Sequence, residues 1–276
     1  MALPQLETID LGNGQVISYR DAGAGECVLI LHGLGGRSES WVPQYEGLSD
    51  QYRVIGWDAP GYGGSSEINL DEPNIEDYAD LVMRFADALE LDRFHLVGHS
   101  VGTCTAARVH QTHPGRLLSL TLAEAVIGNG TSPDDEKENM LVARARDLEE
   151  MGPEEFAMRR TPNSLSPNAE PEAVAAAVEF AQGMRVPGYL KLFGALVRAN
   201  MFKYVEALQV PAMIVAGSDD KSAPEKFVRE IAEAFPGIRY EIIEGIGHQI
   251  AFEKPDLFLN LLKHHLVAAE AAIKGG

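Results

Sequence analysis

Short runs of apolar residues recur along this chain of 276 residues, and turn-forming residues bound most of them. The runs cover residues 27–31, 52–57, 94–97, 117–122, 211–216 and 239–243. Such runs predict strands, and those without polar alternation predict strands buried on both faces of a parallel sheet. Ahead of them, residues 6–20 are interrupted by Gly12-Asn13-Gly14, which predicts a hairpin.

Amphipathic segments separate these runs. In the segment that begins at Asn74, apolar residues recur at the three- and four-residue spacing of one helix face, at Tyr78, Leu81, Val82, Phe85 and Leu89. Further helices are predicted at residues 38–48, 101–113 and 225–234 and after residue 249. Because strands alternate with helices, we expect an α/β fold with a doubly wound, mostly parallel sheet and right-handed crossovers.

The alternation stops between residues 128 and 205, where no run is typical of a strand. Helices are predicted from Ser132, from Pro153, around residues 174–181 and over residues 189–200, with a loop at 161–171. We therefore expect a helical cap at residues 128–205, inserted after the sixth strand. Residues 1–127 and 206–276 would then form one core domain.

The sequence Gly98-x-Ser100-x-Gly102 lies between a predicted strand and a predicted helix. A chain that passes from strand to helix over so few residues must bend sharply, and the bend exposes the central side chain. Glycines on either side let neighbouring backbone approach closely. The pattern therefore predicts that Ser100 is a nucleophile, with the first amides of the following helix beside it.

A serine hydroxyl needs a neighbouring base, and the base needs a carboxylate that orients it. Among eight histidines, His248 alone lies in a glycine-flanked loop at the carboxyl end of a predicted strand late in the chain. His99 precedes the serine, and we expect its side chain to face away from it. Asp219, Asp220 and Glu124 each follow a predicted strand, so the order of residues leaves all three open as the orienting carboxylate.

Two other groups of residues complete the expected site. The strand at residues 27–31 runs into His32-Gly33-Leu34-Gly35-Gly36, a loop whose backbone is accessible, so the Leu34 amide is a candidate donor to a developing oxyanion. The predicted cap supplies large apolar side chains that could line a pocket, at Phe156, Met158, Phe180, Met184, Tyr189, Phe193, Met201 and Phe202. We expect Phe156, Met184 and Phe193 to contact the substrate.

Composition and charge limit the classes of molecule that this protein could bind. The formal net charge is −18, which argues against nucleic acids and anionic membranes as partners and leaves a small-molecule substrate. The two cysteines show no metal or disulfide spacing, and we expect neither a metal nor a cofactor. No signal peptide is recognisable, so we expect a cytoplasmic protein. The sequence leaves the oligomeric state open, with a homo-oligomer among the alternatives.

Five motifs occur in an order found in one known family. They are His32-Gly33, Asp58-x-Pro60-Gly61-x-Gly63-x-Ser65, Gly98-x-Ser100-x-Gly102, the loop from Gly217 to Pro224, and Gly247-His248. The chain resembles the α/β-hydrolase family in its serine-nucleophile branch, over nearly its whole length. In that family the acid loop often reads Gly-x-x-Asp-x-x-x-Pro, which implies that Asp220 is the acid.

The resemblance also implies a chemistry. Ser100 would attack a carbonyl carbon while His248 takes its proton, and the amides of Leu34 and Val101 would bind the oxyanion. Within the family the chain is similar to 3-oxoadipate enol-lactonases and related esterases, which implies hydrolysis of a small carboxylic ester or lactone. The alternatives are carbon–carbon bond hydrolysis of ring-fission diketones, a cofactor-free oxygenase or perhydrolase, and a small-molecule receptor without catalysis.

Overall fold

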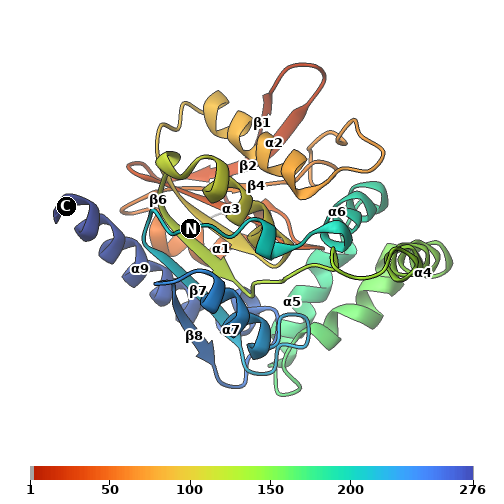
Figure 1. Ribbon diagram of the computed structural model, residues 1–276. Coiled ribbons are helices and arrows are strands. Elements are labelled where there is room, and N and C mark those ends of the chain that lie inside the picture. Colours follow the sequence, from red (N-terminus) through yellow and green to blue (C-terminus); the bar gives the residue numbers. More distant parts are fainter. Residues whose placement is uncertain (1–2, 276) are drawn as a thin grey trace.

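The predicted strands form one sheet through the centre of the molecule, as the computed structural model of residues 3–275 shows (Figure 1). The strands are β1 (Leu6–Asp10), β2 (Val16–Ala22), β3 (Cys27–Leu31), β4 (Arg53–Trp57), β5 (Phe94–His99), β6 (Leu117–Ala123), β7 (Ala212–Gly217) and β8 (Arg239–Ile243). Their order in the sheet is β1-β2-β4-β3-β5-β6-β7-β8. The pairs β1–β2 and β2–β4 are antiparallel, and all others are parallel.

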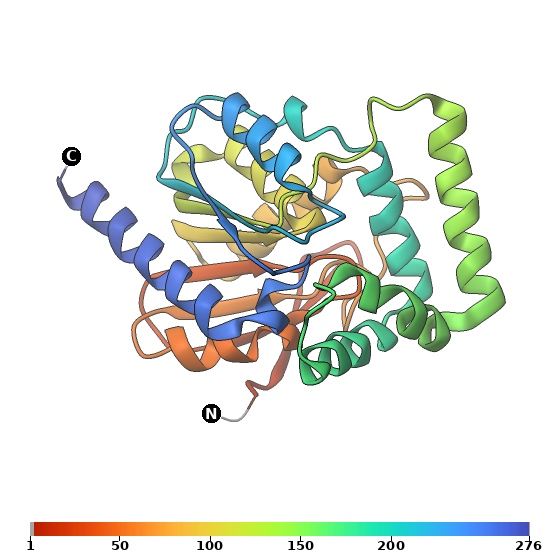
Figure 2. The same cartoon turned by 90° about the horizontal axis from the view of Figure 1, so that it is seen from below.

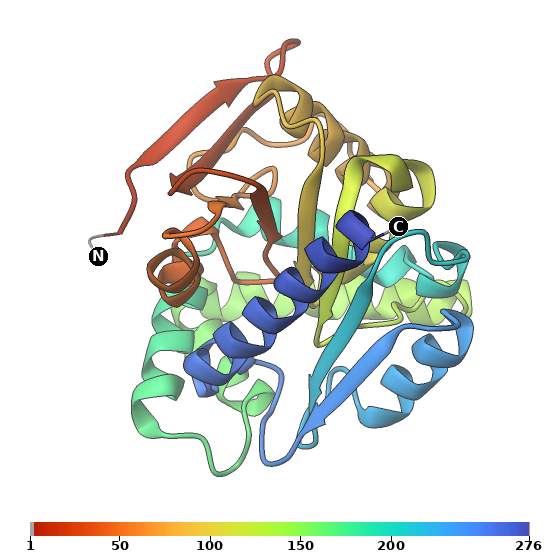
Figure 3. The same ribbon diagram turned by 90° about the vertical axis from the view of Figure 1, so that its left-hand side faces the viewer.

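Helices cover both faces of this sheet. The core helices are α1 (Val42–Leu48), α2 (Ile75–Ala88), α3 (Val101–Thr112), α7 (Glu225–Ala234), α8 (Ile250–Glu253) and α9 (Pro255–Gly275). Figure 2 shows α1 and α9 on one side of the sheet and α7 on the other, and Figure 3 shows α9 crossing its face between the β1–β2 and β7–β8 edges. The prediction of a doubly wound, mostly parallel sheet is therefore confirmed.

The apolar run of β3 explains why both faces need cover. Leu29 and Leu31 belong to the buried cluster that includes side chains of α2, α3 and α7. Val28 and Ile30 point the other way, into the cluster formed with α1 and α9. Because successive side chains of a strand alternate between faces, a run without polar residues can be satisfied only between two helical layers.

The segment between β6 and β7 forms a cap of helices, without a strand in the part of the chain that the structure describes. Its helices are α4 (Asp134–Arg160), α5 (Pro171–Gln182) and α6 (Val186–Arg198), with short turns at Thr161–Ser164 and Met201–Lys203. Gly152, at φ 70 and ψ 168, interrupts α4 immediately before Pro153, so the helix expected from Pro153 is the second half of a kinked one. The boundaries 128 and 205 enclose these elements, and the division into two domains stays a prediction.

The cap touches the core where two glycines meet. A Cβ atom on Gly188, in the first turn of α6, would lie 2.3 Å from the carbonyl oxygen of Gly61 in the loop after β4. Beside this contact, Arg185 Nη1 donates to the Ser65 carbonyl oxygen at 2.7 Å. The start of α6 is thus held directly against core backbone.

The loop after β4 is in turn held by Asp58. This buried carboxylate accepts hydrogen bonds from Ser18 Oγ at 2.5 Å and from the Ser38 amide at 2.6 Å. It therefore connects the loop to β2 and to the segment before α1. No helix among residues 3–275 combines the length and the apolar character that crossing a bilayer requires.

Candidate active site

Ser100 occupies a strained bend between β5 and α3. Its backbone angles are φ 54 and ψ −123, a conformation that residues other than glycine seldom adopt. A Cβ atom on Gly98 would lie 2.4 Å from the carbonyl oxygen of Gly102, and one on Gly102 would lie 2.7 Å from that of Leu31. The two glycines of the sequence pattern are therefore required by the close approach of strand and helix.

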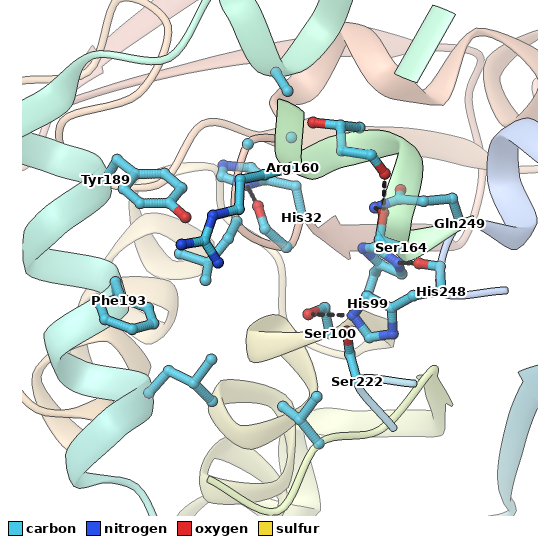
Figure 4. Close-up of a pocket in the computed structure, with 18 of the residues that line it drawn as sticks. His32, His99, Ser100, Arg160, Ser164, Tyr189, Phe193, Ser222, His248 and Gln249 are labelled. Carbon is cyan, nitrogen blue, oxygen red and sulfur yellow. Dashed lines mark hydrogen bonds between the residues drawn. The ribbon is translucent and has the colours of Figure 1, made fainter. Parts of the chain in front are cut away.

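Three side chains from separate loops meet at this bend. Ser100 Oγ lies 2.8 Å from His248 Nε2, and His248 Nδ1 lies 2.7 Å from Asp220 Oδ2 (Figure 4). The second oxygen of Asp220 accepts the amides of Ser222 and Ala223, each at 2.8 Å. Ser100, Asp220 and His248 follow the carboxyl ends of β5, β7 and β8. Because these strands are parallel members of one sheet, their carboxyl ends lie on the same side and bring the three residues together.

The electrostatics of the three groups favour a chain of proton donors and acceptors. Burial alone lowers the pKa of His248, but the hydrogen bond and charge of Asp220 outweigh it, so this pKa lies above its usual value. Burial likewise acts to raise the pKa of Asp220, and the bond and charge of His248 with the two amides reverse it, so that this pKa is lowered. An ionised Asp220 holds the Nδ1 proton of His248, which leaves Nε2 to accept the proton of Ser100.

The two other carboxylates that the sequence left open bind elsewhere. Asp219 Oδ2 accepts Ser166 Oγ of the cap at 2.6 Å. The fully buried Glu124 holds His99 Nε2 at 2.5 Å with one oxygen and accepts the Ile250 amide at 2.7 Å with the other. Of the three, Asp220 is the one that hydrogen-bonds to His248.

The expectation that His99 faces away from the serine is wrong in one respect. Its ring lines the same pocket as Ser100, with its centroid 5.5 Å from that of His248. Glu124 holds it there, and this carboxylate comes 25 residues later in the sequence, directly after β6. Since the partner is not local, the five-residue pattern around Ser100 carries no signal for this orientation.

The amides of Leu34 and Val101 are the two predicted donors to an oxyanion. Leu34 lines the pocket, and Val101 is the first residue of α3, directly after Ser100. Within residues 3–275, neither amide donates a hydrogen bond to the protein. A Cβ atom on Gly33 would lie 2.7 Å from Ser100 Cβ, so a glycine there lets the loop reach the serine. Their role as donors stays a prediction.

A cavity of about 610 Å³ lies between the core and the cap, above Ser100. Phe156, Met184 and Phe193 line it, as do Phe180 and Tyr189. Of the remaining cap side chains offered as lining, Met158 and Phe202 are exposed and Met201 is buried outside the cavity. The volume lies within the range of pockets that bind small molecules.

Sequence reasoning missed two cationic residues of the pocket, Arg144 and Arg160. A signal for Arg144 was present. It stands three residues after Leu141 and four before Leu148, on the face of α4 that those leucines share. An arginine within the apolar face of a helix that covers a cavity is a candidate ligand-binding residue.

The cap is also bonded to the loop that carries the histidine. The His248 amide donates to the Ser164 carbonyl oxygen at 2.6 Å. Glu253 accepts the amide of Ser166 at 2.9 Å and that of Gly247 at 3.0 Å. Burial raises the pKa of Glu253, while these amide bonds oppose the shift. A single carboxylate thus joins the cap to the residue before the histidine.

A second cluster of titratable groups lies outside the pocket. Ligand atoms of Glu26, His95 and Glu270 come within 4.8 Å of one another, a separation that could hold a metal ion. His95 is near the start of β5, whereas His99 is at its end. The cluster therefore lies at the amino ends of the strands, opposite Ser100, and is not part of the same site.

Comparison with known proteins identifies the family. A family model described as the alpha/beta hydrolase fold matches residues 26–255. A protein of Caulobacter sp. (strain K31), provisionally named carbamate hydrolase RutD, is 28% identical over 256 residues, covering 90% of this chain and 92% of its own. The (E)-2-((N-methylformamido)methylene)succinate hydrolase of Acinetobacter baylyi (strain ATCC 33305 / BD413 / ADP1) is 25% identical, with 91% and 94% covered.

A solved structure has a similar fold. The enol-lactonase from Burkholderia xenovorans LB400 matches with a TM-score of 0.81 at 25% sequence identity, over 92% of this chain and 98% of that one. The family model encloses Ser100, Asp220 and His248, and these relatives are named as hydrolases or as a lactonase. This protein therefore belongs to the α/β hydrolase fold family and is a hydrolase.

Proposed function

We propose that this protein hydrolyses a small carboxylic ester or lactone through an acyl-enzyme formed on Ser100. The observation that carries the proposal is the chain of short contacts from Ser100 Oγ to His248 Nε2 and from His248 Nδ1 to Asp220 Oδ2. Nucleophilic acyl transfer needs a hydroxyl that is hydrogen-bonded to a base, and a carboxylate that orients this base.

In the first half-reaction, Ser100 Oγ forms a bond to the carbonyl carbon, and its proton passes to His248 Nε2. The carbonyl oxygen takes the negative charge and accepts hydrogen bonds from the Leu34 and Val101 amides. Asp220 stabilises the imidazolium that forms. When the carbon–oxygen bond of the ester breaks, the leaving alkoxide takes the proton from His248.

In the second half-reaction, water replaces the leaving alcohol. His248 takes a proton from the water, whose oxygen attacks the acyl carbon, and the same two amides bind the second oxyanion. The bond to Ser100 then breaks, and the serine recovers its proton from His248. The products are a carboxylic acid and an alcohol, or one hydroxy or keto acid from a lactone.

The choice of an ester or lactone is supported by the likeness to an enol-lactonase and by a pocket lined largely with apolar side chains. From the charge of −18 we also propose a small-molecule partner, with no nucleic acid or anionic membrane bound. The cytoplasmic location stays a prediction. The homo-oligomer stays a prediction.

The proposal is tested by labelling with a fluorophosphonate and by turnover of a short 4-nitrophenyl ester. We expect the label on the peptide that contains Ser100 and no turnover by Ser100→Ala. Asp220→Asn should abolish most activity, whereas the matched change Asp219→Asn should be mild, because Asp219 binds the cap serine. Turnover that survives Ser100→Ala would refute the proposal, and a ring-fission diketone preferred over esters and enol-lactones would replace it by carbon–carbon hydrolysis.

A further inference from the structure

The pocket has the opposite charge to the rest of the protein. The chain carries 41 acidic against 23 basic residues, yet no aspartate or glutamate is among the described residues that line the cavity. Arg144 and Arg160 are the lining side chains with a permanent charge. In a molecule so rich in carboxylates, a pocket lined by two guanidinium groups and by no carboxylate favours an anionic ligand.

Arg144 is held by aromatic rings. Its guanidinium carbon lies 4.0 Å from the ring centroid of Phe193, 5.5 Å from that of Phe156 and 5.8 Å from that of Tyr189. Nη1 donates to the Tyr189 hydroxyl, the one hydrogen bond that the Arg144 side chain makes within residues 3–275. A guanidinium has five N–H groups, so most of its donors remain available to a ligand, while the rings restrict its position.

No carboxylate of the described chain lies within ion-pair distance of Arg144. Its neighbour Arg160, also near the Phe156 ring, is paired with Asp147. In Figure 4 the Arg160 guanidinium is directed toward Tyr189. Two guanidinium groups and one carboxylate leave one positive charge uncompensated at the cap end of the pocket.

We propose that Arg144 binds a carboxylate group of the substrate, remote from the bond that Ser100 attacks, and so selects an ester or lactone that carries a free carboxylate. This inference rests on the proposed function. The planar fork of arginine matches a carboxylate, which can accept two parallel hydrogen bonds. A single uncompensated positive charge suits a monoanionic carboxylate better than a phosphate dianion.

The test compares two substrates of the same length and leaving group: 4-nitrophenyl hydrogen adipate, which carries a carboxylate, and its methyl ester, which does not. We expect wild-type protein to show a higher kcat/KM for the charged ester. In Arg144→Gln the ratio of the two kcat/KM values should fall about 10- to 100-fold, the range expected for a charge-assisted hydrogen bond. In Arg144→Lys the ratio should fall less, because lysine keeps the positive charge but cannot donate two parallel hydrogen bonds to a carboxylate.

Arg146→Gln is the matched control, since it removes the same charge from an exposed position of the same helix. An unchanged ratio in Arg144→Gln, or an equal fall in Arg146→Gln, would overturn the inference. Should Arg144→Gln fail to fold, competitive inhibition of wild-type protein decides: hexanoate must inhibit more strongly than 1-hexanol and pentylphosphonate, and the reverse order would refute it. Loss of all ester turnover with an unlabelled Ser100 would instead refute the proposed function.

Discussion

The backbone contact between Gly61 and Gly188 allows a test in which two physical effects predict opposite signs. Gly188 lies in the first turn of α6, and alanine is the better helix former by up to about 1 kcal/mol. Propensity alone would therefore make Gly188→Ala stabilising. The new methyl group, however, would meet the carbonyl oxygen of Gly61 at 2.3 Å. The Cβ position is fixed by the backbone of residue 188, and the oxygen it meets is itself backbone, so no rotation can relieve the contact.

The magnitude follows from the distance. Real Cβ contacts do not fall below 3.0 Å, so α6 and the loop after β4 must separate by about 0.7 Å. Overpacking of this kind costs about 1–3 kcal/mol, and subtracting a propensity gain of up to about 1 kcal/mol leaves a net loss of about 0–2 kcal/mol. We expect the upper part of this range, because the methyl group meets backbone that must move as a whole. Because Tyr189 and Phe193 follow on α6 and line the pocket, we also expect kcat/KM to fall.

Urea unfolding and ester turnover measure the two effects on the same samples. Gly115→Ala is the control, since an added Cβ there meets nothing within 4 Å. It should leave both the free energy of unfolding and kcat/KM unchanged. A Gly188→Ala variant that is as stable as wild type or more stable, with unaltered turnover, would show that the cap does not depend on this contact.

Three further predictions concern buried titratable groups. Since Asp220 holds the pKa of His248 above its usual value, the acid limb of kcat/KM should lie above pH 6.5. Turnover should rise with pH as the imidazole loses its proton, and a limb at or below pH 6.5 would contradict this. Burial lowers the pKa of His95 and of His265 to about 4, so the unfolded state binds protons first as the pH falls. Each should therefore remove about 2 kcal/mol of stability between pH 7.5 and 5, which urea unfolding at the two pH values measures. Asp58→Ala should lower the free energy of unfolding by about 2–5 kcal/mol in the same assay, because Ser18 Oγ and the Ser38 amide lose their acceptor. Asp58→Asn keeps one oxygen and can donate to the Ser18 hydroxyl, so it should cost less than about 1.5 kcal/mol.

Much of the fold is encoded locally. The run from Cys27 to Leu31 has no polar residue, so both faces of the strand must be covered, and the helices that alternate with the strands supply the cover. The bend at Ser100 is local in part, because Gly98 is needed by the backbone of Gly102, whereas Gly102 is needed by Leu31 of the neighbouring strand. Such features depend on chain sterics and can be recognised from a short stretch of sequence.

The parts that could not be predicted depend on contacts between distant residues. His99 is oriented by Glu124, whose own partner is the Ile250 amide, and no spacing rule connects these positions. Asp219 and Asp220 are adjacent, and only the backbone conformation after β7 decides which of them reaches His248. Of the two pocket arginines, Arg144 had a sequence signal in its position on the apolar face of α4, whereas only the placement of the cap over the sheet brings Arg160 into the pocket.

The bonds from Ser164 and Ser166 to the loop of His248 bear on how this enzyme could be redesigned or could diverge. A cap that touched only substrate could be exchanged for another, and selectivity would change while the chemistry stayed intact. Here the exchange would also remove the acceptor of the His248 amide and a donor to Glu253. A chimera should therefore retain residues 161–170 of this chain and replace only the helices on either side, because substrate preference and placement of the base share that segment.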